Sequence, residues 1–128
     1  MKDLHSHISP AIALSAVVVA STLTSGAIDL QGFGSAEVLI NAGAVAGAGN
    51  VTVKLQHSHT TTSGDFVDVV AADLLGAFPA ALVAATIYRV GYVGPRRYVR
   101  TVSTLNSGTS IAAAIMVLRG HPADSPIA

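Results

Sequence analysis

Hydrophobic and polar residues alternate with a period of two in three segments of the chain. In 51–57, valine, leucine and histidine occupy one set of alternate positions, and threonine, lysine and glutamine occupy the other. The segments 35–42 and 65–70 alternate in the same way. Because successive side chains of a β-strand point to opposite faces, this pattern predicts strands with one buried face.

Apolar segments with weaker alternation predict further strands, separated by turn-forming residues. The segment 109–118 is apolar on both faces, which is typical of a central strand or of one at an interface. The alanines of 79–90 permit a helix, but its β-branched and aromatic residues favour a strand. We expect a hairpin loop over the Gly- and Ala-rich 43–50 and one helical turn over 71–76. The other predicted strands are 11–20, 27–30, 82–93 and 96–105.

Seven or eight short strands predict an all-β fold, either an antiparallel β-sandwich or a barrel, of jelly-roll-like type. The chain has 128 residues, which is the size of one domain. We expect an extended N-terminal arm over 1–10, a single β domain over 11–119, and an extended C-terminal tail over 120–128, where two prolines occur.

Charged residues are scarce. They make up 11% of the chain, against roughly 25% in an average soluble domain, while 51% of the residues are hydrophobic. A small domain with so little charge tends to associate, so we expect much of its surface to be covered by other copies or other proteins. The formal net charge is zero, which argues against a nucleic-acid-binding protein, because such proteins usually carry a basic excess.

The apolar run 11–20 has two interpretations. As a signal peptide it would suit cleavage before Ser21, but Lys2 is offset by Asp3 and Pro10 precedes the run. Its three consecutive valines favour a buried or interface strand, which is the interpretation we adopt. Ten residues are too few to cross a bilayer as a helix, so we expect no membrane association.

No arrangement of residues predicts catalysis, and we expect neither an enzyme nor a cofactor. Asp65 and Asp68 are three residues apart and would face opposite sides of a strand. The serines lack the setting of a catalytic nucleophile, and no phosphate-binding loop occurs. The histidines of 5–7 and 57–59 form two H-x-H pairs that could hold a metal with His121, but we favour the interpretation that they are terminal and turn residues.

Four of the five arginines lie in 89–100, and three of them follow a Gly-Pro turn. We consider three interpretations of this cluster: phosphate binding, a solvated hairpin shoulder, or a protein interface. Arginine mixed with tyrosine is typical of interfaces, and cation–π packing is available to it. We therefore predict an interface made by Arg96, Arg97, Arg100, Tyr92 and Tyr98.

Five segments resemble a family of small tailed-phage and prophage proteins that are usually encoded among virion structural genes. The likeness covers about 26–122, and its motifs are structural rather than catalytic. The segments are 27–35, 53–58, 66–69 with 73–76, 89–100 and 117–122.

This resemblance implies a virion component, and our first hypothesis is a capsid decoration (cement) protein on the outer capsid surface. Such proteins are typically small, rich in β structure and often trimeric. The implied partners are the major capsid protein and other copies of the chain, as a homotrimer. The alternatives are a tail or head–tail connector subunit and, from a different class, a secreted ligand-binding β-domain.

Overall fold

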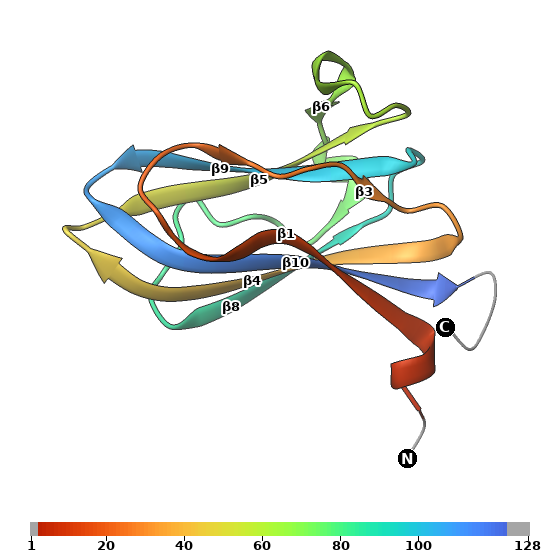
Figure 1. Cartoon of the computed structure of the whole chain (residues 1–128), viewed down its shortest axis with the longest axis horizontal. Helices are drawn as coiled ribbons and strands as arrows, with labels where there is room; N and C mark the ends of the chain where they lie inside the picture. The colour runs from red at the N-terminus through yellow and green to blue at the C-terminus, as the bar shows by residue number, and fades with distance from the viewer. Residues whose placement is uncertain (1–2, 123–128) are drawn as a thin grey trace.

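The computed structural model describes residues 3–122, and over this range the chain folds into two antiparallel sheets that pack face to face (Figure 1). The described part contains no α-helix, so no helix there could cross a membrane. The prediction of an all-β sandwich is confirmed, whereas the barrel alternative is wrong because the sheets do not close. The strands are β1 (Ile8–Val19), β2 (Leu23–Thr24), β3 (Ile28–Asp29), β4 (Phe33–Ala46), β5 (Asn50–Ser58), β6 (Val67–Asp68), β7 (Leu74–Leu75), β8 (Thr86–Tyr92), β9 (Tyr98–Ser107) and β10 (Ser110–Pro122).

The strands pair in a nested order. Sheet A has the order β1-β10-β4-β8-β7, and sheet B has the order β2-β9-β5-β6, with β3 also paired to β9. The first strand therefore pairs with the last, β2 and β3 with β9, β4 with β8, and β5 with β6. This is a long antiparallel hairpin rolled into two layers, which is the arrangement of a jelly roll.

The core lies between the two sheets and follows the alternation of the sequence. Val51, Val53 and Leu55 of β5 are buried, and so are Val38 and Ile40 of β4. Full burial of such a side chain stabilises the fold by roughly 1.5–3 kcal/mol. The strands predicted over 35–42 and 51–57 are thus confirmed, together with their inward faces. The strand predicted over 65–70 is wrong in extent and in its buried face, because only the two exposed residues of β6 pair there.

Three strands extend beyond their expected limits. β1 begins at Ile8, inside the expected arm, and Ile8 pairs with Gly120 of β10, inside the expected tail. β4 continues to Ala46 through the expected loop 43–50, because its pairing with β10 overrides the low strand propensity of glycine and alanine. The parts of the arm and tail at 1–2 and 123–128 lie outside the described residues.

The segment between β7 and β8 closes one side of the sandwich. Leu82 is buried in the core, and its backbone N–H donates to the carbonyl of Val51 at 3.0 Å. The helical alternative for 79–90 is wrong, since this segment is irregular up to β8. The turn expected over 71–76 is present as η3 (Ala71–Asp73), a short 3₁₀ helix that leads into β7. The other 3₁₀ turns are η1 (His5–His7) and η2 (Ser63–Asp65).

Candidate interaction surfaces

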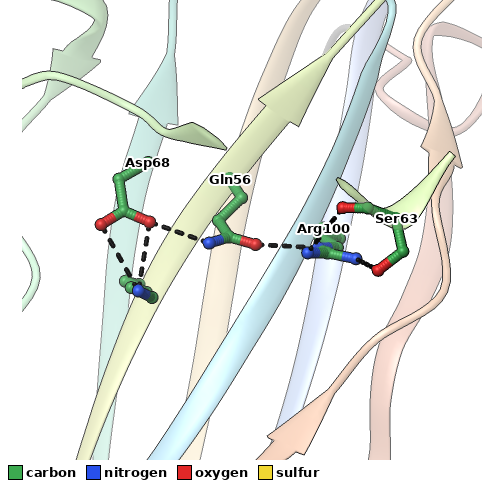
Figure 2. A network of polar contacts seen from close by, with 5 residues as sticks. Gln56, Ser63, Asp68 and Arg100 are labelled. Carbon is green, nitrogen blue, oxygen red and sulfur yellow. Dashed lines mark hydrogen bonds and ion pairs between the residues drawn. The ribbon is translucent and has the colours of Figure 1, made fainter. Parts of the chain in front are cut away.

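A network of polar side chains covers the outer face of sheet B (Figure 2). Arg100 donates from Nε to Gln56 Oε1 at 2.8 Å, and Gln56 Nε2 donates to Asp68 Oδ1 at 2.8 Å. Lys54 forms an ion pair with the same carboxylate at 3.1 Å, and Arg100 also donates to Ser63 Oγ at 2.9 Å. The hydrogen bond from Gln56, followed by that from Lys54, lowers the pKa of Asp68. The network joins β5, β6 and β9 and leaves this face polar.

The Arg100 side chain makes two kinds of contact within the chain, a cation–π contact and hydrogen bonds. Its guanidinium lies over the ring of Phe66, with Cζ 4.3 Å from the ring centroid, and Phe66 is buried beneath it. The side chain is half-buried, and its hydrogen bonds go to Gln56 and Ser63. Arg100 therefore stabilises sheet B, which is a role that its place in the arginine cluster did not predict.

Arg97 forms a bidentate ion pair with Asp29. Its Nε and Nη2 donate to the two carboxylate oxygens at 2.9 and 2.8 Å. These hydrogen bonds are the main cause that lowers the pKa of Asp29 to about 2. Both side chains remain 43% exposed, so the pair contributes little to stability. Arg97 Cζ also lies 4.9 Å from the centroid of the Tyr98 ring.

Tyr92 belongs to the core and not to the surface. Its side chain is 4% exposed because it falls on the inner face of β8, where it lies opposite Ala36. The phenolic oxygen lies 2.7 Å from His57 Nδ1 and accepts a hydrogen bond from the Arg96 backbone N–H at 3.2 Å. The prediction that Tyr92 is an interface contact is therefore corrected, since its buried ring supports the following turn from inside.

The turn at 93–97, which we call the arginine loop, presents Arg96 and Arg97 beside Tyr98. The Arg96 side chain is half-buried, and its guanidinium makes no hydrogen bond to any residue in 3–122. The loop borders a cavity of about 490 Å³ that is also lined by His59 and by 30–36. Of the five predicted contact residues, the structure thus brings Arg96, Arg97 and Tyr98 together at the surface.

The outer face of sheet A is apolar, in contrast to sheet B. One row across four strands consists of Ile12, Met116, Leu39 and Arg89. Ile12 is 73% exposed, and Ile87 in the next row is 72% exposed. We call this surface the apolar face, and its hydrophobic members are Ile12, Val18, Leu39, Leu75, Ile87, Met116 and Leu118.

Part of this face was foreseen. The apolar pattern of 109–118 predicted a central or interface strand, and β10 lies inside sheet A, between β1 and β4. The sequence also predicted a buried or interface strand over 11–20, which is most of β1. The outward positions of β4 and β8 were missed, because each contributes too few exposed apolar residues to stand out alone. At one end the face is hollowed into a groove of about 900 Å³ between η1 and β7.

The histidine pairs do not form a metal centre. His57 is buried against Tyr92, whereas His59 lies beyond the end of β5 and is exposed. His121 instead hydrogen-bonds through Nδ1 to Ser35 Oγ at 2.8 Å. Residues 3–122 contain no group of three or more histidine or acidic side chains that could hold a metal ion. Burial is the main cause that lowers the pKa of His57, and the charge of Arg96 lowers it further.

Comparison with known proteins adds information on the fold. No protein-family model and no curated protein sequence matches the chain. Among solved structures, the SPBc2 prophage-derived protein YomS aligns with a TM-score of 0.52 and 9% identity, over 92% of this chain and 98% of YomS. PirA aligns with a TM-score of 0.44 and 14% identity, over 94% and 97% of the two chains. A structure of infectious bursal disease virus strain Gx aligns at 0.45 and 11%, over 93% of this chain and 33% of the viral chain. The likeness to YomS shows that the two proteins share a fold along nearly their whole lengths.

Proposed function

We propose that the chain is a non-catalytic structural component of a phage particle. The observation that carries this proposal is the apolar face, an exposed hydrophobic sheet surface on a protein with very few charges. Exposed apolar surfaces of this kind mark sites of association. A subunit that is covered by its neighbours in an assembly explains both the face and the composition.

Two further observations support a phage particle as the assembly. The sequence resembles small virion proteins of tailed phages and prophages, and the fold matches a prophage-derived protein. Jelly rolls are also frequent in viral capsid domains, although lectins and other proteins use them too. The resemblance therefore supplies the class of particle, and the fold is consistent with it.

Within the particle we propose a capsid decoration protein that binds the outer shell across the boundaries of major capsid protein subunits. The arginine loop supplies the shell contact in this proposal, through Arg96, Arg97 and Tyr98. Arginine and tyrosine are enriched in the energetically important parts of interfaces. Several subunits bound to one shell would gain from multivalency, so each single contact need not be strong.

Cryo-EM of purified particles that contain the chain tests this proposal. Density on the outer capsid where subunits meet is the expected result, with the arginine loop toward the shell. Density in the tail or neck would keep the structural class and replace decoration by a tail or connector role. Absence of the chain from particles would overturn the proposal.

A further inference from the structure

We propose that the apolar face joins two copies of this chain across a two-fold axis. This inference names the partner of the surface on which the proposed function rests. Pairing of two copies can be measured on the purified chain without any particle. A two-fold pair differs from the homotrimer that the sequence resemblance implied.

The face is self-complementary in charge. Its two charged residues, within the described part of the chain, are Glu37 on β4 and Arg89 on β8. Neither side chain forms an ion pair or a hydrogen bond with any other described residue. In an isologous interface the same patch of both copies is in contact. If residue i of one copy contacts residue j of the other, then residue j of the first copy also contacts residue i of the second. One acid and one base on the same patch can therefore form two equivalent ion pairs between two copies.

The register places these charges beside the hydrophobic rows. Leu39 lies opposite Arg89, and Glu37 lies opposite Gly91 one row away. Leu75 crosses over Gly91, with its Cβ 3.1 Å from the position that a Cβ of residue 91 would occupy. Hydrophobic side chains flank both charges, since Glu37 lies in one row between Leu118 and Leu75, and Arg89 lies beside Leu39 in the next row.

The face is a better candidate than the sheet edge. β1 forms the long open edge of sheet A, but it contains Pro10 and two irregularities of register, between Ile12 and Leu14 and between Leu14 and Val17. Proline and bulges are devices that protect an edge strand from pairing with another chain. The opposite edge, β7, has two residues. The edges of sheet A are thus protected against pairing with another chain, whereas the apolar face has no such protection.

A second copy fits this face better than an unrelated partner. The zero net charge brings no long-range repulsion between copies. An unrelated protein would have to supply an acid and a base at matching positions, whereas a second copy supplies both. Two sheets that pack face to face lie about 10 Å apart, which is the packing that already joins sheets A and B within each molecule.

Sedimentation equilibrium of the purified full chain tests the inference. We expect a mass twice the 12.9 kDa of one chain, falling to one chain on dilution. Ile87→Lys and Met116→Lys should each weaken the dimer by roughly tenfold or more, because each puts an unpaired charge into the interface. Val67→Lys, on β6 of sheet B, is the matched control and should leave the dimer unchanged. Circular dichroism and thermal unfolding show whether each variant is folded.

A charge swap provides the sharper test. Glu37→Arg and Arg89→Glu should each weaken the dimer, because each places like charges where the copies meet, and the double variant should restore it. A wild-type chain that is monomeric at high concentration, or trimeric, would overturn the pairing, and so would a double variant no better than the single ones. Binding to particles is measured separately, so a monomer that still binds them would refute the pairing and leave the proposed function standing.

Discussion

The phenolic oxygen of Tyr92 lies 2.7 Å from Nδ1 of His57, and this hydrogen bond joins sheet A to sheet B through the core. The two rings meet edge to face, with centroids 5.6 Å apart and an interplanar angle of 83°. Burial raises the pKa of Tyr92, so the phenol stays neutral and keeps its proton.

Tyr92→Phe should lower the free energy of unfolding by about 1–3 kcal/mol, because it leaves the buried His57 ring and the Arg96 N–H without their partner. Urea unfolding followed by circular dichroism measures this loss. Tyr98→Phe is the control, since the Tyr98 hydroxyl makes no hydrogen bond within 3–122, and it should change stability by less than about 0.5 kcal/mol. Equal losses in the two variants would contradict the structural role of the Tyr92 hydroxyl.

Stability should decrease as the pH falls below about 6.5, the ordinary pKa of histidine. The pKa of His57 is lowered in the folded protein, so just below that pH the His57 side chain binds a proton in the unfolded chain but not in the folded chain. The loss of stability continues until the pH falls below the pKa of His57 in the folded protein. Unfolding measured between pH 8 and pH 5 should show this slope, and His57→Gln should flatten it. Asp29 and Asp68 contribute no slope in this window, because their pKa values lie below 4.

Arg100→Ala should lower the free energy of unfolding by about 1–2 kcal/mol, since it removes hydrogen bonds to Gln56 and Ser63 and uncovers Phe66. Arg96→Ala should cost less than about 0.5 kcal/mol, because its side chain makes no hydrogen bond within the described chain. Chemical denaturation of the two variants side by side checks the difference. If both variants lost the same stability, the hydrogen bonds of Arg100 would not stabilise sheet B.

The double substitution of Arg96→Glu with Arg97→Glu should weaken binding to the particle, as the proposed shell contact requires. Folding should persist, because both side chains lie at the surface and the Asp29 pair contributes little. Co-sedimentation with particles that lack the chain measures binding. Val83→Glu, at a 60% exposed position outside the arginine loop, is the control that gains a negative charge and should bind normally. Undiminished binding by the double variant would remove the arginine loop from the interface.

Gly108→Ala should lower the free energy of unfolding by more than about 2 kcal/mol. Gly108 has φ +76°, a conformation that costs other residues about 1–2 kcal/mol, and a Cβ there would overlap the carbonyl oxygen of Ala48. Gly64→Ala is the matched control, because nothing lies within 4 Å of its added Cβ. Thermal unfolding of the two variants gives the comparison, and similar midpoints would contradict the tight approach of the two hairpins.

Alternation at 51–57 and 35–42 was sufficient to predict two strands and their inward faces, because it reports which side of a strand is buried. The same alternation at 65–70 failed, since only two exposed residues form a strand there. It did not identify partners. Arg97 pairs with Asp29, 68 residues away, and His57 with Tyr92, 35 residues away. Such pairings depend on the order of strands in the sheets, which the periodicity of a single strand does not encode. For the same reason, the arginine cluster was predicted as one surface, although Tyr92 is buried in the core and Arg100 belongs to the network on the outer face of sheet B.

The nested pairing also has a consequence for how the chain is made. β10 lies between β1 and β4 in sheet A, yet it is translated after the nine other strands. Until it emerges from the ribosome, β1 and β4 have no common partner, and the apolar face lacks Met116 and Leu118. A chain released before β10 is complete would therefore leave β1 unjoined to β4, β8 and β7. The topology therefore makes completion of sheet A depend on the last-translated of the described strands.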